Sequence, residues 1–250
     1  MNKTILITGA TSGIGKASAE LLGANGHKLI ITGRREDRLL ELKESLSHLT
    51  EVHTLCFDVR DKENIPAIIK SIPDEFLPID VLINNAGNAY GMGPIHEGDT
   101  DDWDNMMDIN VKGLLYMTRA VSPSMVERKS GHIVNIASIA GLDTYANGAV
   151  YCASKSAVIA ASEAIRKDFN PYGIKVTTIN PGLVETEFSE VRFHGDKERA
   201  ESVYQGYIPL TAFDIAETIE FAITRPAHVN IGDMLVLPTA QAASTMVKKS

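Results

Sequence analysis

Residues 4–15 read Thr-Ile-Leu-Ile-Thr-Gly-Ala-Thr-Ser-Gly-Ile-Gly. The apolar run at 5–7 predicts a buried β-strand, and the glycines after it have the spacing G-x-x-x-G-x-G. Glycine lets a backbone turn sharply and approach a diphosphate closely, and a helix starting there presents free N–H groups to an anion. The stretch therefore predicts a strand, a turn and a helix that hold a diphosphate-bearing ligand, although such turns also occur without one. The residues expected to contact that ligand are Gly9, Thr11, Ser12, Gly13, Ile14 and Gly15.

Short apolar runs alternate with segments of helical spacing along the rest of the chain. Leucines recur three or four residues apart from Leu39 to Leu49, and apolar side chains do so from Met107 to Met125. This alternation predicts an α/β fold, a doubly wound parallel sheet of about seven strands with helices on both faces. The expected strands are residues 4–8, 28–32, 52–59, 81–84, 132–137, 175–179 and 234–237.

No linker or repeat interrupts the alternation, so residues 1–250 are expected to form a single ligand-binding and catalytic domain. The least regular stretch, residues 182–206, follows a strand and is rich in charged residues. Ligands of such sheets lie beyond the carboxyl ends of the strands. Residues 183–206 are therefore expected to form a loop that closes over a substrate.

Composition narrows the classes of partner. The formal net charge is -8, whereas nucleic-acid-binding domains are usually basic. The two cysteines, Cys56 and Cys152, form neither a disulfide framework nor a metal-ligand pattern. No apolar stretch approaches the roughly 20 residues of a membrane span, and the run at 5–7 is too short for a signal peptide. A cytoplasmic protein acting on a small molecule, without a metal, is the expectation.

The end of the second expected strand reads Thr32-Gly33-Arg34-Arg35. A site for NAD usually has Asp or Glu there, which binds the ribose 2′-hydroxyl. Guanidinium groups suit a 2′-phosphate instead, because their planar fork donates hydrogen bonds in pairs. Arg34 and Arg35 therefore favour NADP as the cofactor. The alternative is a solvated helix start in which residues 34–38 form local ion pairs.

Two more strand ends carry candidate cofactor contacts. Asp58 can accept a hydrogen bond from the adenine amino group, with Val59 near the ring; the alternative is an Asp that merely precedes a helix. The small residues Asn85, Ala86 and Gly87 allow a cofactor to pass close to the backbone, although an Asn/Gly turn explains them equally.

Candidate catalytic residues follow the fifth expected strand. Tyr151 and Lys155 lie four residues apart, on one face of a helix. A phenol with a pKa of about 10 is a poor base, but a nearby ammonium group lowers that pKa. Tyr151 is therefore expected to transfer a proton, helped by Lys155 and a positive nicotinamide ring, while Ser138 donates a hydrogen bond to the substrate oxygen. The alternatives are an exposed Tyr–Lys pair and a capping serine.

Asn110 is a fourth candidate. It stands in a helical pattern with Gly113 three residues later, and both residue types disfavour helix interiors. A local rule broken inside an otherwise good helix often marks a functional site. A tolerated polar position is the alternative.

Taken together, these motifs resemble the short-chain dehydrogenase/reductase family over nearly the whole chain. The matching elements are the glycine loop, Asn84 to Gly87, Asn110, Ser138, Tyr151 with Lys155, and Pro181-Gly182 with Thr186. The resemblance implies a Rossmann-type fold and a catalytic tetrad of Asn110, Ser138, Tyr151 and Lys155. It also implies that Tyr151 and Lys155 contact the cofactor, Lys155 through the nicotinamide ribose, and that Asn110 holds a water in a proton relay. The residues implied along the nicotinamide are Pro181, Gly182, Val184 and Thr186. Ser12 departs from many NADP-using members, which have a basic residue there.

Other stretches resemble the NADP-dependent 3-hydroxy acid dehydrogenases within that family. They are residues 33–35 with Arg38-Leu39, residues 113–121, residues 186–193 with Gly195-Asp196, and residues 226–230. The resemblance implies oxidation of serine, allo-threonine and related acids, reduction of malonic semialdehyde, and a homotetramer or dimer. Its members' substrates carry a carboxylate, and one guanidinium in the loop would hold such a group well.

Arg192 is the expected carboxylate ligand, because it lies within the matching segment. An ion pair on the surface is the equal alternative. Two other functions stay open: a reductase of neutral ketones or 3-oxoacyl thioesters, and a redox sensor that binds a dinucleotide without turnover. Small residues recur on one side of the Tyr151 helix, from Ala153 to Ala164. They permit close helix packing, either inside the domain or between subunits.

Overall fold

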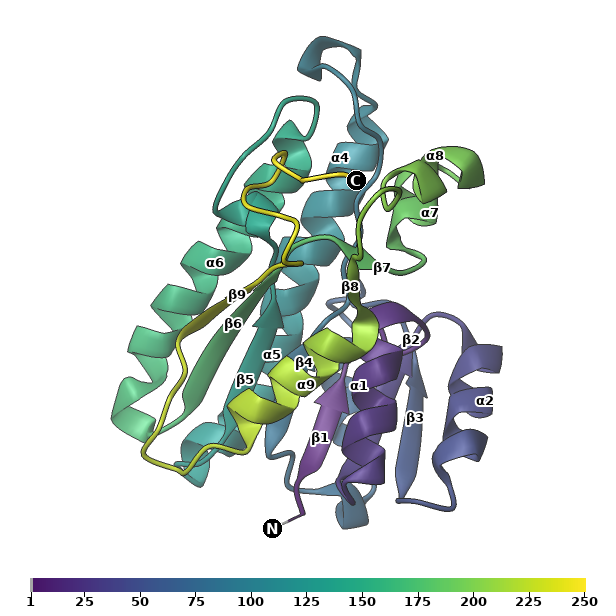
Figure 1. The fold of residues 1–250 in the computed structure, drawn as a ribbon. Coiled ribbons are helices and arrows are strands. Elements are labelled where there is room, and N and C mark those ends of the chain that lie inside the picture. Colours follow the sequence, from purple (N-terminus) through teal and green to yellow (C-terminus); the bar gives the residue numbers. More distant parts are fainter. Residues whose placement is uncertain (1) are drawn as a thin grey trace.

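The seven expected strands meet in one sheet (Figure 1). The computed structural model describes residues 2–250, and its main sheet has the order β3-β2-β1-β4-β5-β6-β9 with every neighbouring pair parallel. The predicted doubly wound Rossmann-type fold is therefore confirmed. The strands are β1 (Thr4–Ile7), β2 (Lys28–Gly33), β3 (Val52–Cys56), β4 (Val81–Asn84), β5 (His132–Ile136), β6 (Lys175–Pro181) and β9 (Asp233–Val236).

The strand order reverses at β1, which decides where a ligand can bind. β1 pairs with β2 on one side and with β4 on the other, so that Ile5 lies between Leu29 and Val81. The connections leave β1 and β4 in opposite directions, which opens a crevice at their carboxyl ends. Open α/β sheets bind their ligands in this crevice.

Helices cover both faces because successive strand residues point to opposite sides. Ile5 and Ile7 pack into a core with α1 (Gly13–Ala24), α2 (Glu36–Leu46) and α9 (Ala212–Ile223). Leu6 packs on the other side, in a core shared with α3 (Ile65–Lys70), α5 (Leu114–Glu127) and α6 (Ala149–Phe169). Figure 1 shows α1 and α9 together across one face. Each fully buried Leu or Ile contributes about 1.5–3 kcal/mol, so the two cores hold the strand ends in fixed positions.

A π-helical turn interrupts the long helical segment before β5. α4 (Thr100–Met107) continues through the π turn at Asp108–Gly113 into α5. Such turns occur frequently at functional sites, and this one contains Asn110. Single 3-10 turns lie at Asp74–Phe76, Ile95–Glu97, Ile139–Gly141 and Asn170–Tyr172.

The region expected to be irregular is more ordered than its sequence indicated. It contains β7 (Val184–Glu185), which pairs with β8 (Leu210–Thr211), and the short helices α7 (Phe188–Arg192) and α8 (Lys197–Ser202). The Asp196 side chain accepts a hydrogen bond from the Arg199 N–H and so caps α8. β3 ends at Cys56 rather than at residue 59, because Asp58 accepts from the Arg60 N–H in a turn. None of the helices found between residues 2 and 250 is long and apolar enough to span a bilayer.

Candidate active site

A cavity of about 500 Å³ lies at the carboxyl ends of the strands. The glycine loop, the ends of the strands and the segment after β6 line it together. The structure brings all the sequence-predicted site residues to this wall except Gly15 and Asn110, which lie behind it. One cavity thus collects positions that extend from Gly9 to Arg192.

The glycine loop forms a cradle that side chains would fill. Gly9 has φ +68°, and a Cβ there would lie 2.9 Å from the Ala86 Cα. A Cβ on Gly15 would lie 2.3 Å from the Gly9 carbonyl oxygen, so Gly15 lets the loop fold back on itself. The side-chain Nδ2 of Asn85 donates to the Thr8 and Gly9 carbonyl oxygens at 2.9 and 3.1 Å. A diphosphate fits this loop, since backbone N–H groups at the start of α1 can approach it closely.

The arginines at the end of β2 face the same cavity. Arg34 Nη1 lies 3.5 Å from Asp58 Oδ2, and Arg35 Nη2 donates to Thr11 Oγ1 and Ser12 Oγ, each at 2.9 Å. These partners are distant in sequence, and no ion pair forms between two side chains of residues 34–38, although Arg34, Arg35 and Arg38 are partly exposed. Guanidinium groups at this position fit a 2′-phosphate.

Asp58 is held as a carboxylate in the cavity wall, beside Arg34. Burial alone would raise its pKa, but hydrogen bonds from Arg60 outweigh that effect and lower the pKa below its usual value. Arg60 Nη2 lies 2.7 Å from Asp58 Oδ2. An ionised Asp58 can accept a hydrogen bond from an amino group such as that of adenine.

Tyr151 and Lys155 project from the first turns of α6 into the cavity, and both are buried. Lys155 Nζ donates to the Ile136 carbonyl oxygen at 3.0 Å and lies 6.0 Å from the centroid of the Tyr151 ring. Burial lowers the pKa of Lys155 to about 8. Burial also raises the pKa of Tyr151, against the hydrogen bond from Ser138 and the charge of Arg192. We predicted that Lys155 lowers the pKa of the Tyr151 phenol. Without a cofactor, the pKa is instead raised, because desolvation is the largest effect.

Ser138 both caps a turn and faces the cavity. Its Oγ accepts from the Ala140 N–H at 3.1 Å. That contact uses a lone pair, so the hydroxyl proton can be donated to the Tyr151 oxygen or to a substrate oxygen. The capping role therefore does not compete with a hydrogen bond to a substrate oxygen.

The Asn110 side chain does not line the cavity, but it holds the backbone of Asn88, a residue of the cavity wall, by two hydrogen bonds. Its Oδ1 accepts from the Asn88 N–H, and its Nδ2 donates to the Asn88 carbonyl oxygen, both at 2.8 Å. Nδ2 also lies 3.0 Å from Ser154 Oγ on α6. The side chain thus ties the segment after β4 to the Tyr151 helix.

Arg192 reaches the cavity from α7. Its guanidinium carbon lies 5.5 Å from the Tyr151 ring centroid and 5.6 Å from that of Tyr145. Nε donates to the Gly91 carbonyl oxygen at 3.3 Å, whereas the buried Nη2 has no acceptor within the described residues. No carboxylate of residues 2–250 lies within 4.0 Å of this group. The surface ion pair considered for Arg192 is therefore not formed.

Several lining residues carried no signal in the sequence. The Phe188 ring centroid lies 5.7 Å from that of Tyr151. Gln241 Oε1 accepts from the Leu183 N–H at 2.9 Å and so fixes the segment after β6. Glu187 forms ion pairs with Arg35 and Arg38. These contacts join segments far apart in sequence, so spacing alone could not indicate them.

Comparison with known proteins agrees with this geometry. The model of the short chain dehydrogenase family matches residues 3–197. The NADP-dependent 3-hydroxy acid dehydrogenase of Escherichia coli (strain K12) is 47% identical over 238 residues, 95% of each chain. Sulfoacetaldehyde reductase 2 of Chromohalobacter salexigens is 44% identical over 245 residues, 98% of this chain and 97% of the relative.

Among solved structures, the closed form of serine dehydrogenase complexed with NADP+ superposes with a TM-score of 0.93. It is 45% identical, and the match covers 98% of this chain and 99% of the other. The fold, the family match and these relatives together show that the chain belongs to the short-chain dehydrogenase family.

Proposed function

We propose that the protein is an NADP-dependent oxidoreductase that transfers a hydride between NADP(H) and a short 3-hydroxy acid of the serine, allo-threonine and 3-hydroxypropionate class. The observation that carries the substrate class is the Arg192 guanidinium beside Tyr151, with a buried nitrogen that no acceptor of the described residues satisfies. Relatives named for NADP, 3-hydroxy acids and serine support the same assignment.

The residues that would hold the cofactor line the cavity from Arg34 and Arg35 to Lys155. The glycine loop holds the diphosphate, Arg34 and Arg35 hold the 2′-phosphate, and Asp58 with Val59 contacts the adenine. Residues 85–87 line the middle of the cofactor, and Pro181 to Thr186 line its nicotinamide. When bound, NADP+ accepts the hydride and NADPH donates it.

Tyr151 exchanges a proton with the substrate oxygen, and Ser138 donates a hydrogen bond to that oxygen. Lys155 is cationic below a pKa of about 8, and its charge favours the phenolate form of Tyr151. Asn110 is a positioning residue, because it holds the Asn88 backbone and the start of α6 in register.

Arg192 binds the carboxylate of the substrate. A charge-assisted hydrogen bond between a guanidinium and a carboxylate is roughly twice as strong as a neutral one. The free Nη2 can donate to a carboxylate oxygen while Nε keeps its bond to Gly91. A carboxylate held there places the hydroxyl carbon of a short substrate near Tyr151.

The variant Arg192→Met tests this role, with Arg199→Met as the control. Arg199 is an exposed arginine of the same segment that lies over Phe193, 4.3 Å from the ring centroid. We expect Arg192→Met to raise KM for serine about ten- to a hundredfold, the loss of one or two charge-assisted bonds, and to spare a neutral secondary alcohol. Equal effects on serine and on the alcohol would contradict the assignment and favour a reductase of neutral carbonyls. Sulfonate-bearing aldehydes belong in the same assay, since a guanidinium also binds them.

We also propose a cytoplasmic homotetramer or dimer, in which residues 1–250 act as one unit and 183–206 form the substrate loop. Ala153, Ala160 and Ala164 of α6 are exposed, so these small side chains do not pack inside this chain. A second subunit packing on α6 would cover them.

Both cysteines are free thiols, which fits a reducing compartment.

A further inference from the structure

Three residues of the cavity wall carry a buried polar atom that has no hydrogen-bond partner among residues 2–250: Thr32, Asn88 and Arg192. Thr32 lies on β2, next to the arginines of the cofactor site. At the other end, Arg192 Nη2 is an unpaired donor and Asn88 Oδ1 is an unpaired acceptor. Buried polar atoms are rarely left unpaired, so a ligand that pairs with both fits this end of the cavity.

Asn88 stands between Lys155 and Arg192. A Cβ on the preceding residue, Gly87, would lie 3.4 Å from Lys155 Nζ. Three positions further along, the Gly91 N–H donates to the Arg192 carbonyl oxygen at 2.9 Å, and the Gly91 carbonyl oxygen accepts from Arg192 Nε at 3.3 Å. The segment after β4 therefore runs from Lys155 to Arg192, along the space that a short 3-hydroxy acid would occupy.

The backbone of Asn88 is fixed by bonds that do not use its side chain. Asn110 pairs with its N–H and its carbonyl oxygen, and Asn110 is joined through Ser154 to the backbone of Tyr151. The next residue, Ala89, packs in the apolar cluster that contains Tyr151, whereas Asn88 lines the cavity and is only 6% exposed. The last torsion of an Asn side chain has two wells about half a turn apart. The amide can therefore turn either Oδ1 or Nδ2 to a ligand.

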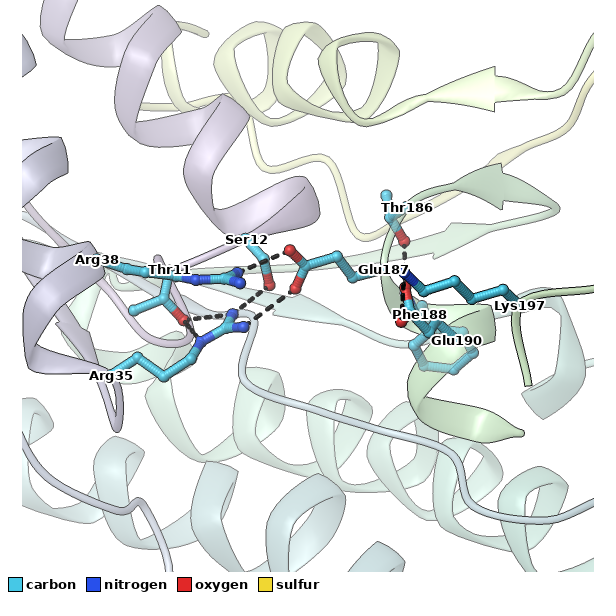
Figure 2. A network of polar contacts seen from close by, with 9 residues as sticks. All are labelled: Thr11, Ser12, Arg35, Arg38, Thr186, Glu187, Phe188, Glu190 and Lys197. Atoms are coloured by element: carbon cyan, nitrogen blue, oxygen red, sulfur yellow. Dashed lines mark hydrogen bonds and ion pairs between the residues drawn. The ribbon is translucent and has the colours of Figure 1, made fainter. Parts of the chain in front are cut away.

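The acidic side chains of the cavity wall are already paired with arginines. Within residues 2–250 these are Asp58 and Glu187. Asp58 Oδ2 lies 2.7 Å from Arg60 Nη2. Figure 2 shows Glu187 between Arg35 and Arg38, with oxygen to nitrogen distances of 3.1 and 2.7 Å. The amino group of a substrate such as serine would therefore have to be bound by a neutral acceptor.

We propose that Asn88 is a specificity-determining residue, whose amide oxygen accepts a hydrogen bond from an amino or hydroxyl group on the carbon next to the substrate carboxylate. Arg192 holds the carboxylate itself. This inference rests on the proposed 3-hydroxy acid activity, and it ranks the substrates of that activity by the polarity of their second carbon. A methyl group at this carbon leaves Oδ1 unpaired, and a site built to hydrogen-bond a substrate N–H or O–H group disfavours an analogue without it.

The test compares two acids of the same size and the same configuration at the second carbon. One is serine, and the other is 3-hydroxy-2-methylpropanoate, which has a methyl group in place of the amino group. The measured quantity is the ratio of kcat/KM for serine to kcat/KM for the methyl acid, with NADP+ supplied in excess.

Two variants of Asn88 separate hydrogen bonding from shape. Asn88→Leu keeps a branched side chain but has no hydrogen-bonding group, and Asn88→Asp keeps the shape and adds a negative charge. Thr32→Val is the matched control, because it removes the unpaired hydroxyl at the other end of the same cavity.

We expect a wild-type ratio above one, and Asn88→Leu should lower it about ten- to a hundredfold, the loss of one hydrogen bond to a charged group. Asn88→Asp should raise the ratio about three- to tenfold, because its charge repels both substrate carboxylates but attracts only the ammonium group of serine. Thr32→Val should leave the ratio unchanged. Adenosine 2′,5′-bisphosphate, the part of NADP that carries the 2′-phosphate, should bind equally to the wild type and to each variant.

Each contrary result has a distinct meaning. A ratio that stays the same in both Asn88 variants, even if both substrates react more slowly, would overturn the inference and show that Asn88 acts on the cofactor or the wall alone. If Asn88→Leu fails to bind the bisphosphate and so fails to fold, the ratio in Asn88→Asp decides by itself. A wild-type protein that oxidises a neutral alcohol but neither acid would overturn the proposed function, and the inference with it.

Discussion

Tyr151 and Lys155 are both shifted by burial toward their neutral forms, since the pKa of the phenol is raised and that of the amine is lowered to about 8. A positive charge beside them, such as that of an oxidised nicotinamide ring, lowers the pKa of the phenol and that of the amine. Oxidation requires the pair to accept a proton, and reduction requires it to donate one. The rate of oxidation at limiting substrate should therefore rise with pH toward the apparent pKa of the pair, and that of reduction should fall above it.

The variant Tyr151→Phe removes the proton-transferring hydroxyl and keeps the ring that packs on Phe188. We expect kcat to fall about 10²–10⁴-fold, the usual contribution of a positioned acid or base, and the pH dependence to disappear. Binding of adenosine 2′,5′-bisphosphate should be unchanged, which shows that the fold and the cofactor site are intact. Turnover at the wild-type rate would remove Tyr151 from the mechanism.

At the scale of elements, the sequence predicted all seven strands of the main sheet. Helices cover both faces of this sheet, so its strands appear in the sequence as uninterrupted apolar runs. Strand ends were less predictable, as β3 shows, where Asp58 and Arg60 form a turn. The sequence placed Asn110 in a disfavoured helical position but could not indicate a π turn. The sequence did not indicate α7 and α8, because each is shorter than two helical turns and shows no clear periodicity. In so short a helix a single capping residue, such as Asp196 in α8, carries much of the stability.

β5 contains a titratable group that should control acid stability. His132 is buried, its Nε2 lies 2.8 Å from Thr177 Oγ1, and burial with the charge of Lys175 lowers its pKa to about 3. The unfolded chain, with a histidine pKa near 6.5, binds more protons between these values, so stability falls as pH falls below about 6.5.

From pH 7 to pH 5 this one histidine should reduce the free energy of unfolding by about 2 kcal/mol. Urea unfolding at both pH values measures the loss in the wild type and in His132→Gln, which keeps a hydrogen-bonding side chain toward Thr177. The variant should lose about 2 kcal/mol less than the wild type over that interval. An identical loss in both proteins would show that His132 does not titrate as its burial predicts.

The whole molecule is acidic, with a net charge of -8, yet its cavity gathers Arg34, Arg35, Lys155 and Arg192. The sequence indicated Arg34 and Arg35 by the end of a strand, Lys155 by its spacing from Tyr151, and Arg192 only by its place in a segment that resembles the family. Contacts between distant segments, such as Glu187 with Arg38, depend on how the segment after β6 folds back over β2. No local pattern contains that information.

The exposed alanines of α6 make a prediction about assembly. Ala160→Arg places a long cation on the face that we propose meets another subunit, and we expect sedimentation to show a smaller species than the wild type. Glu44→Arg, on the exposed side of α2, is the control and should sediment like the wild type. An unchanged size in Ala160→Arg would place the interface elsewhere or show a monomer.

The central claim is tested most directly by the absorbance of NADPH or NADH formed when the protein is supplied with NADP+ or NAD+ and one of four alcohols. These are serine, allo-threonine, 3-hydroxypropionate and a neutral secondary alcohol. The geometry of Arg35 and Arg192 predicts turnover of the three acids with NADP+ and little with NAD+ or the neutral alcohol. Turnover only of the neutral alcohol, or only with NAD+, would contradict the account.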